Sequence, residues 1–210
     1  MSRAPDLPEA SGLRRSALAA ERNLAPILAV LARHAPKSGN ALEIASGTGQ
    51  QITAFAAAHP GLIWQGSDFD PANLQTIEAW AAYAPAPNLL PPVRLDAAQT
   101  GWSRDHARLS LILTVNLTHL IPATAVLTLL REAALALRSG GVFMIYGPFL
   151  REGRATSAGD LEFDANLRAR DPATGYKDID WIKTQLEAVG FGVVVEDMPA
   201  NNLMLTARKP

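Results

Sequence analysis

Acidic side chains occur at three points in the first half of the chain, each beside a short apolar segment. Glu43 lies within one such segment, Asp68 follows a second and Asp96 follows a third. Removing a carboxylate from water is costly unless the group is paired or hydrogen-bonded. If these segments are neighbouring strands, their acids would meet at one edge of a sheet. This spacing therefore suggests a ligand that carries hydrogen-bond donors or positive charge.

A turn of small residues, Ser46–Gly49, follows the segment that holds Glu43. The pattern becomes helical from Gln50, which predicts a buried strand that turns sharply into a helix. Glycines at such a turn permit positive φ and close approach of a ligand, and the first amides of the helix offer donors. Asp68 lies 19 residues after Gly49, the separation at which an acid can accept from both ribose hydroxyls. Asp96 would lie further along the same edge, near an adenine amino group, so a nucleoside ligand is implied.

Apolar strands alternate with helical segments along most of the chain. Strands are predicted over residues 41–45, 62–67, 93–95, 109–115, 142–146, 193–196 and 203–207, and helices over 25–34, 50–58, 71–80, 122–138, 161–169 and 179–189. Near-continuous apolar strands joined by helices predict a parallel sheet that is covered on both faces. The last two strands are joined too closely for a parallel crossover, so the final strand must be antiparallel. The predicted fold class is α/β, with a seven-stranded Rossmann-like sheet.

Prolines and glycines predict where the elements break. Because proline is best tolerated in the first turn of a helix, Pro26 predicts two helical segments with Glu21–Asn23 in their connection. Four prolines between residues 85 and 92 predict a loop, and Gly140-Gly141 predicts the end of the preceding helix. Residues 147–159 form a long predicted loop, of the kind that often serves function.

Composition limits the classes of protein that this chain can represent. The 210 residues are 48% hydrophobic and carry a net charge of −1, without a cysteine. We expect a loose arm over residues 1–12, an N-terminal arm over 1–20 that is partly disordered or helical, and one domain over 21–210. The balanced charge argues against nucleic acid and membrane surfaces as partners. The absence of a signal peptide and of a long apolar run predicts a soluble cytoplasmic protein. The sequence assigns no oligomeric state.

Metal binding is not expected. The four histidines lack ligand spacing. Asp160 and Asp164, four residues apart on a predicted helix, are interpreted as a solvated helical face.

Three segments together resemble the motifs of class I S-adenosylmethionine-dependent methyltransferases. Glu43–Gly49 is similar to their acidic-x-Gly-x-Gly-x-Gly motif, with Ala45 in place of the first glycine. Gly66–Pro71 resembles their ribose motif and Leu95–Ala98 their adenine motif. A dinucleotide site would instead need glycine where Ile52 stands, and Glu43 would repel its pyrophosphate.

At a finer level, the chain resembles an uncharacterised methyltransferase-like branch that is built on a domain of unknown function. The resemblance covers roughly residues 20–208. It rests on Glu21–Asn23, Glu43–Gly49, Tyr146–Phe149, Thr156-Ser157, Phe163-Asp164, Arg168–Asp171 and Met198–Asn202. It implies the class I methyltransferase fold and S-adenosylmethionine as cofactor, with S-adenosylhomocysteine as product, but it supplies no substrate.

The resemblance and the spacing together assign candidate roles. The residues expected to bind the cofactor are Glu43, Ala45, Ser46, Gly47, Gly49, Asp68, Phe69, Asp96, Ala97 and Asn116. Candidates for catalysis are His119, as a general base, and Tyr146, which would orient the substrate. Each has a structural alternative, as a hydrogen-bonded residue of the interior. The substrate candidates are Arg22, Asn23, Pro148, Phe149, Asn201 and Asn202. Local hydrogen bonding in turns is an equally good explanation for the two C-terminal asparagines.

Transfer of a methyl group to a small-molecule acceptor is the function that these features favour. A binding or interaction module that keeps the fold without catalysis is the first alternative, and binding of cofactor without turnover would favour it. A nicotinamide-dependent oxidoreductase is the second, and NADH binding would test it.

Overall fold

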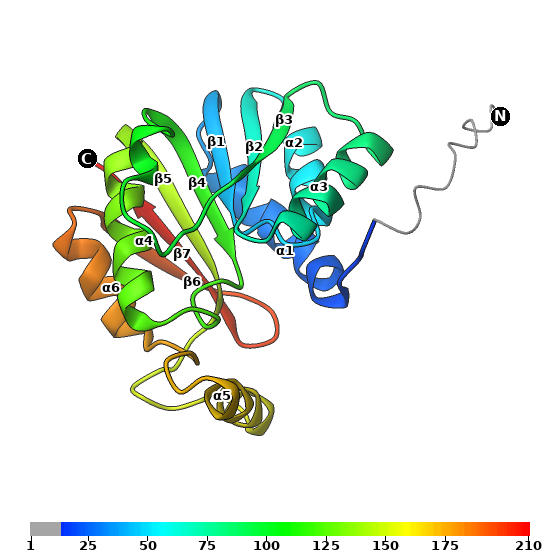
Figure 1. Ribbon diagram of the computed structural model, residues 1–210. Coiled ribbons are helices and arrows are strands. Elements are labelled where there is room, and N and C mark those ends of the chain that lie inside the picture. The colour runs from blue at the N-terminus through cyan, green and yellow to red at the C-terminus, as the bar shows by residue number, and fades with distance from the viewer. Residues whose placement is uncertain (1–13) are drawn as a thin grey trace.

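The computed structural model describes residues 14–210, and in this part of the chain seven strands form one sheet (Figure 1). The strands are β1 (Gly39–Ile44), β2 (Leu62–Asp68), β3 (Leu89–Arg94), β4 (Leu109–Val115), β5 (Leu137–Pro148), β6 (Gly192–Asp197) and β7 (Asn202–Arg208). Their order across the sheet is β3-β2-β1-β4-β5-β7-β6. The predicted loose arm over residues 1–12 lies outside the described residues.

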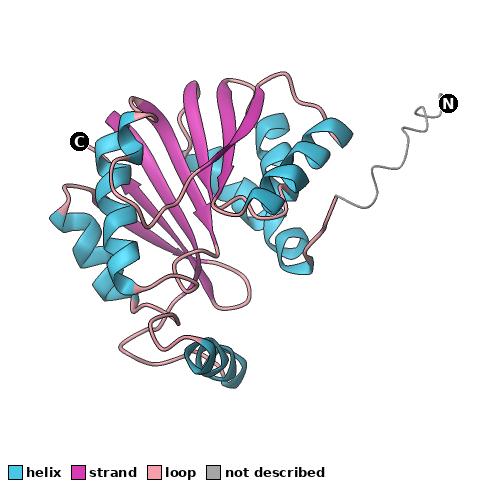
Figure 2. Cartoon of the chain, in the orientation of Figure 1, coloured by secondary structure: helices cyan, strands magenta, loops and turns pink. Residues whose placement is uncertain are grey.

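Helices cover both faces of the sheet (Figure 2). They are α1 (Leu18–His34), α2 (Gln50–Ala58), α3 (Pro71–Tyr83), α4 (Ala123–Ala136), α5 (Ala158–Arg170) and α6 (Ile179–Ala188), with a short 3-10 helix at Trp102–Arg104. The apolar residues of α1, α2 and α3 pack on one face, and those of α4 and α6 pack on the other. Two layers of buried side chains therefore hold the sheet between them, as the near-continuous apolar strands require.

The strand order reverses between β1 and β4, which are neighbours in the sheet although they are not consecutive in the chain. From β1 the chain moves outward to β2 and β3, and it then returns to place β4 on the other side of β1. The loops that leave β1 and β4 diverge at this point. The carboxyl edge of the sheet is consequently open to a ligand beside β1.

The end of the chain confirms the predicted reversal. Strand β7 pairs antiparallel with both β5 and β6, whereas the other pairs of neighbouring strands in residues 14–210 are parallel. The seven-stranded α/β sheet with a reversed last strand is thus confirmed.

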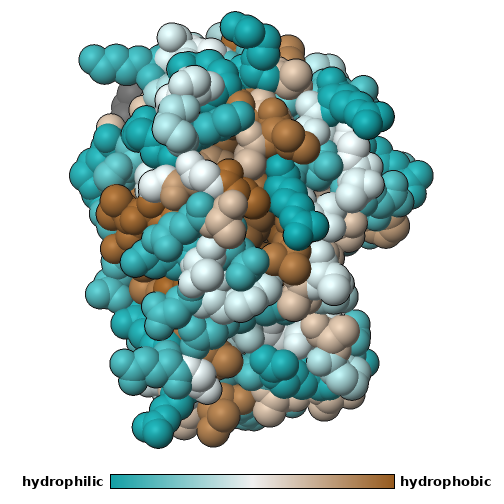
Figure 3. Space-filling view, turned by 90° about the vertical axis from the view of Figure 1, so that its left-hand side faces the viewer, coloured by the Kyte–Doolittle hydropathy of each residue, from teal (hydrophilic) through white to brown (hydrophobic). Residues whose placement is uncertain are grey.

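The side of the molecule that carries α6 presents hydrophobic side chains among more numerous hydrophilic ones (Figure 3).

The prediction of two helical segments around Pro26 is wrong. A single helix, α1, runs through this proline, and Glu21–Asn23 lie within it. Pro26 has no amide hydrogen, so the carbonyl of Arg22 loses its helical partner. Burial of Ile27, Val30 and Leu31 against the sheet outweighs this loss.

Two boundaries also differ from the prediction. Strand β3 includes Pro91 and Pro92, in the segment that was expected to be a loop. It is an edge strand, and its register against β2 shifts at these prolines, neither of which pairs with a residue of β2. Strand β5 begins at Leu137, before Gly140-Gly141, because α4 ends two residues earlier than the glycines suggest.

Helix α5 lies apart from the two helical layers, beyond the carboxyl end of β5 (Figure 1). Ser157 caps its first turn by accepting a hydrogen bond from the Asp160 amide. In residues 14–210 no helix is both long and apolar enough to cross a membrane.

Candidate functional site

The turn between β1 and α2 places three residues in the left-handed region, with φ of 59° at Ala45, 56° at Gly47 and 79° at Gly49. A Cβ added to Gly49 would lie 2.5 Å from the Ile77 Cα, so the close approach of α3 requires glycine there. A Cβ added to Gly47 would meet no heavy atom within 4 Å. The main chain at Gly47 is therefore open to a ligand.

Asp68 ends β2 and is fixed by three hydrogen bonds. One carboxylate oxygen accepts from the Gly47 amide at 2.9 Å, and the other accepts from the Asp70 amide and the Asn73 side chain, both at 3.0 Å. An ionised carboxylate offers about four acceptor positions. Asp68 can thus still accept from a ligand hydroxyl while it braces the glycine turn.

A cavity of about 470 Å³ lies at the carboxyl edge, around the turn after β1. Its volume falls within the range of small-molecule sites. It is lined by Ala17, Ala19, Ala20, Glu43, Ile44, Ala45, Ser46, Gly47, Thr48, Gln51, Asp68, Phe69, Asn73, Leu95, Asp96, Ala97, Ala98, Val115, Asn116, Leu117, Leu120 and Ile121.

Nine of the ten residues expected to bind the cofactor line this one cavity. The tenth, Gly49, lies next to the wall and serves the packing of α3. These residues lie at or just after the carboxyl ends of β1, β2, β3 and β4, and the parallel pairing of these strands brings them together. Their binding of S-adenosylmethionine stays a prediction.

Glu43 is the most unusual group in the cavity wall. Its side chain is almost completely buried, and its Oε2 atom has no hydrogen-bond partner among residues 14–210. Burial raises the pKa of this carboxyl from 4.5 to about 7; the nearby Ser46 hydroxyl opposes the rise, and the charge of Asp68 adds to it. A buried, unpaired acid of this kind needs a cation or a donor, and a ligand ammonium would supply both.

The opposite part of the cavity is suited to a flat ring. Phe69 is 56% exposed in the wall, and its ring lies 5.4 Å from the Arg94 guanidinium carbon. Asp96, which also lines the cavity, accepts from the Ala98 amide at 2.9 Å, and this bond fixes its carboxylate. Leu117 supplies apolar surface from the loop after β4. These groups could cover a base and bind its exocyclic amine.

Nine further residues in the wall lie outside the expected binding residues and their motifs. They are Ala17, Ala19, Ala20, Gln51, Asn73, Val115, Leu117, Leu120 and Ile121. Of these residues, only Asn73 could have been predicted from the sequence, because it stands in the first turn of the helix that follows Asp68. The three alanines stand at the start of α1, Ala17 as its N-cap and the other two in its first turn, and this end of the helix lies at the cavity.

His119 does not line the cavity. It is 5% exposed, and its ring lies 6.0 Å from that of Phe163 and 5.8 Å from that of Tyr176. Burial lowers the pKa of its imidazole to about 4, the charge of Lys177 adds to the effect, and Asp164 opposes it. Its Nδ1 atom has no hydrogen-bond partner within the described chain. A neutral histidine packed beneath α5 is the resulting arrangement.

Tyr146 is also buried away from the cavity, on the face of the sheet that α1 covers. Burial raises the pKa of its hydroxyl, while the positive charge of Arg22 and the nearby Asn202 oppose the rise. Arg22 is exposed on α1, whereas Asn23 beside it is buried. Four candidates from three distant segments thus lie on one side of the sheet: Arg22 and Asn23 of α1, Tyr146 of β5 and Asn202 of β7.

The remaining substrate candidates have structural partners. Pro148 pairs with Asn202 in the sheet, and Asn202 donates to the Pro199 carbonyl at 3.0 Å. Phe149 is buried in the core cluster on the α4 and α6 face. Asn201 has a φ of 60° and donates to Asp160 at 2.9 Å. Their contact with a substrate stays a prediction.

The interpretation of Asp160 and Asp164 as a solvated helical face is wrong. Asp160 accepts from the hydroxyls of Thr156 and Ser157 as well as from Asn201. These hydrogen bonds lower its pKa against the effect of burial. Contacts of α5 with distant segments bury Asp164 and give Asp160 hydrogen-bond partners, which the sequence of the helix alone does not predict.

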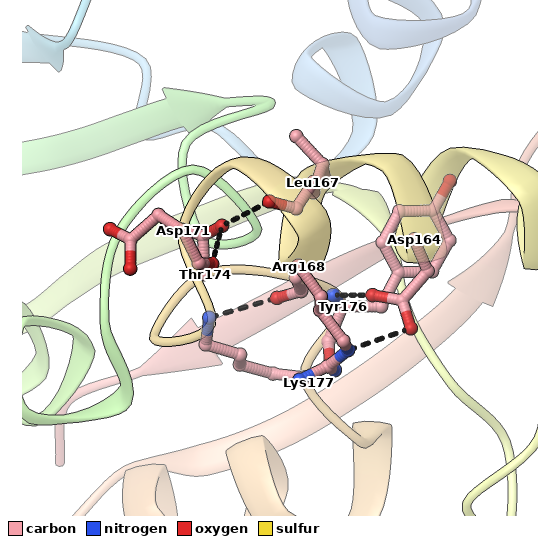
Figure 4. A network of polar contacts seen from close by, with 8 residues as sticks. Asp164, Leu167, Arg168, Asp171, Thr174, Tyr176 and Lys177 are labelled. Carbon is pink, nitrogen blue, oxygen red and sulfur yellow. Dashed lines mark hydrogen bonds and ion pairs between the residues drawn. The ribbon is translucent and has the colours of Figure 1, made fainter.

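Asp164 is the centre of a second network (Figure 4). It is 9% exposed and accepts from Arg168 at 3.0 Å and from the Tyr176 amide at 2.6 Å. Arg168 also donates to the Tyr176 carbonyl, and Lys177 donates to the carbonyls of Ile121 and Gly175. These bonds fasten α5 to the segment that follows it and to the loop after β4.

Residues 14–210 contain no group of three or more histidines and acids that could hold a metal ion. The arrangement at the sheet edge instead offers an open main chain at Gly47, carboxylates at Asp68 and Asp96, and an unpaired acid at Glu43. These are groups that suit a nucleoside with a positively charged substituent.

Solved structures with the same fold place the chain in a structural class. An O-methyltransferase family protein from Burkholderia thailandensis is 15% identical with a TM-score of 0.77, and the match covers 90% of this chain and 56% of that one. Human N-acetylserotonin methyltransferase, solved in complex with SAM, is 15% identical with a TM-score of 0.73, covering 89% and 51%. The YcgJ protein from Bacillus subtilis is 12% identical with a TM-score of 0.69, covering 90% and 98%.

The chain therefore has the fold of class I methyltransferases, and it spans about half of the length of the first two matched structures. A family model matches residues 14–209, and its description reads "Protein of unknown function (DUF938)". This chain belongs to that family. The resemblance to an uncharacterised methyltransferase-like branch is thus confirmed.

Proposed function

We propose that the protein is an S-adenosylmethionine-dependent methyltransferase that acts on a small-molecule acceptor. The single observation that carries this proposal is the convergence of Glu43, the open turn at Gly47, Asp68 and Asp96 on one cavity of about 470 Å³. Solved neighbours of the same fold include one in complex with SAH and one in complex with SAM, which supports the choice of ligand.

The residues present fit this cofactor. The unpaired Oε2 atom of Glu43 would accept from its ammonium group, and the open main chain at Gly47 leaves room for its methionine portion. Asp68 would accept from the ribose hydroxyls, and Asp96 from the adenine amine, with Phe69 covering the base. When bound, S-adenosylmethionine supplies an electrophilic methyl group on a sulfonium, whose leaving group needs no protonation.

Positioning would supply most of the catalysis. The glycine turn and Asp68 brace each other through the hydrogen bond between them, so the groups that hold the cofactor are fixed in advance. Leu117, Leu120 and Ile121 form an apolar wall that would exclude water next to the bound cofactor. The near-zero net charge and the concave site support a small molecule, rather than a nucleic acid, as acceptor.

Calorimetric titration with S-adenosylmethionine and S-adenosylhomocysteine tests the proposal. Both should bind with one site per chain. Asp68→Ala should weaken binding at least tenfold, because it removes a charge-assisted acceptor and frees the glycine turn. The matched control is Asp180→Ala, at an exposed acid in the first turn of α6. Absence of binding of both ligands to the wild-type protein would sink the proposal.

A binding module without catalysis is the second candidate. It is favoured by the observation that neither His119 nor Tyr146 lines the cavity, so no candidate base faces the bound cofactor. Incubation with S-adenosylmethionine carrying a labelled methyl group and a varied set of small nucleophiles separates the two. Label that enters an acceptor supports the enzyme, and tight binding without transfer supports the module.

An oxidoreductase is disfavoured by the same cavity. Ile52, at the position where a dinucleotide site needs glycine, is fully buried, and the acid at Glu43 would repel a pyrophosphate. We expect no binding of NADH.

A further inference from the structure

The segment from Arg14 to Ala20 joins two parts of the molecule that are distant in the sequence. Its first residues lie on α3, and its last residues open α1. Three of its small side chains, Ala17, Ala19 and Ala20, line the cavity of the candidate site. We call residues 14–20 the strap, because they cross from α3 to the wall of the cavity.

Arg15 fastens the strap to the first turns of α3. Its guanidinium donates to Asn73 Oδ1 at 2.9 Å, to the Thr76 hydroxyl at 3.2 and 3.3 Å, and to the Ala72 carbonyl at 3.3 Å. The Trp80 indole donates to the Arg15 carbonyl at 2.7 Å. A side chain with this many hydrogen-bond acceptors is held in place rather than free in solvent. We call these contacts of Arg15 with α3 the latch.

Arg14 adds a second hold of a different kind. Its guanidinium carbon lies 3.6 Å from the ring centre of Tyr83 and 5.0 Å from that of Trp80. Contacts of a cation with aromatic faces are favourable even near the surface. The strap is therefore attached along α3 at two adjacent arginines.

The latch reaches the ligand-binding carboxylate through one side chain. Asn73 accepts from Arg15 with its Oδ1 atom and donates with its Nδ2 atom to Asp68 Oδ1 at 3.0 Å. Because the oxygen of the Asn73 amide is held by Arg15, its nitrogen is directed at Asp68. Asp68 in turn holds the Gly47 amide. A continuous chain of hydrogen bonds thus connects the strap to the glycine turn.

We propose that the strap retains the bound nucleoside cofactor, and that Arg15 is a positioning residue that acts through Asn73 on Asp68. This inference rests on the proposed function, since it concerns the same cavity. When the strap is fastened, the start of α1 closes one wall and the Asp68 carboxylate is aligned for a ligand diol. When it is released, the wall formed by the three alanines moves away and Asn73 is free to turn.

Stopped-flow measurement of S-adenosylhomocysteine dissociation tests the latch. Loss of hydrogen bonds of this kind should raise the dissociation rate and Kd of Arg15→Ala by roughly three- to tenfold. Arg15→Lys, which keeps a charged donor, should lie between this variant and the wild type. The matched control, Arg131→Ala, changes an exposed arginine of α4 on the other face of the sheet and should bind like the wild type.

A double variant identifies the route. If Arg15 acts through Asn73, Arg15→Ala should raise Kd by a smaller factor in the Asn73→Ala background than in the wild type, and equal factors in both backgrounds would overturn this route. Melting curves without ligand show whether each variant is folded. A merely structural role would change these curves and leave the dissociation rate of folded protein unaltered.

Limited digestion with trypsin reports on the strap in the unaltered protein. Cleavage after Arg14 and Arg15 should become slower at saturating S-adenosylhomocysteine. The proposal about the strap fails, while the proposed function stands, under the following result. The wild type binds S-adenosylhomocysteine, the ligand does not slow cleavage of the strap, and Arg15→Ala releases the ligand at the wild-type rate. If the wild type does not bind it, both inferences fail.

Discussion

Ala45 adopts a backbone conformation that glycine takes more easily. Its φ is 59°, in the left-handed region, at the position where the resembling motif has its first glycine. For a residue with a Cβ this region costs roughly 1–2 kcal/mol. The cavity nevertheless includes Ala45 in its wall, so the methyl group does not close the turn. Alanine in place of the first glycine of the motif therefore lowers the stability of the protein, but it leaves space for the ligand.

Ala45→Gly should stabilise the protein. Relief of the strained φ outweighs the greater freedom of glycine in the unfolded chain, so the free energy of unfolding should rise by about 1 kcal/mol. Urea unfolding measures this change. The matched control is Ala29→Gly in the middle of α1, which should lower the same quantity by about 1 kcal/mol. Equal losses in the two variants would contradict the role of strain at Ala45.

Glu43 should make stability depend on pH. Its pKa is raised from 4.5 to about 7 by burial, so between these values the folded state binds more protons than the unfolded state. Stability contributed by the protonated group is therefore lost as the pH rises through this window. Relative to Glu43→Gln, the wild type should lose about 2–3 kcal/mol between pH 5 and pH 8.

Urea unfolding of both proteins at the two pH values measures the difference. The exposed Glu78 of α3 provides the control, because Glu78→Gln should keep the pH dependence of the wild type. Parallel pH profiles for the wild type and Glu43→Gln would refute the argument. A bound cation should reduce the loss at pH 8, since it stabilises the ionised carboxylate.

At the scale of elements, α5 is held to the sheet edge by polar bonds at two acids. Asp160 joins the start of the helix to the turn between β6 and β7, through Asn201. Asp164 joins its middle to Tyr176. The aromatic contact of Phe163 with His119 adds a third attachment. A helix held in this way can open without disturbing the two apolar layers of the core.

Asp160→Ala should loosen α5 selectively. The substitution removes the acceptor shared by Thr156, Ser157 and Asn201, and each lost bond contributes about 1 kcal/mol. Amide exchange in residues 158–170 should accelerate roughly fivefold or more, while β4 and β5 keep their protection. Exchange measured by mass spectrometry checks this, with Asp180→Ala in α6 as control. Uniform acceleration across the sheet would contradict an independent α5.

Helix α1 shows why element boundaries resist prediction. Its proline is unfavourable within an isolated helix, and the local pattern accordingly indicated a break. The complete helix forms because its apolar side chains are buried by strands that follow much later in the chain. Position in the sheet explains β3, whose prolines are tolerated because the strand lies at the edge and its register against β2 shifts there.

At the scale of the whole molecule, the order of the strands creates the site. The acids at the carboxyl ends of β1, β2 and β3 are separated by 25 or more residues in the chain, and the parallel sheet brings them to one cavity. The reversal between β1 and β4 opens that edge, and the antiparallel β7 places its turn near α5. The likeness to the three solved structures lies in this arrangement, since the identities are only 12–15%.

The sequence by itself determined the parallel sheet, the reversed last strand and nine residues of the cavity wall. These follow from short-range regularities: apolar runs, glycines at a sharp turn and acids at the ends of strands. Only the tertiary structure decided that His119 and Tyr146 lie away from the cavity. It also decided that Asp160 and Asp164 accept hydrogen bonds from other parts of the chain, and that the strap is connected to Asp68 through Asn73. Each of these depends on contacts between distant segments, whose geometry is fixed by the packing of the whole chain.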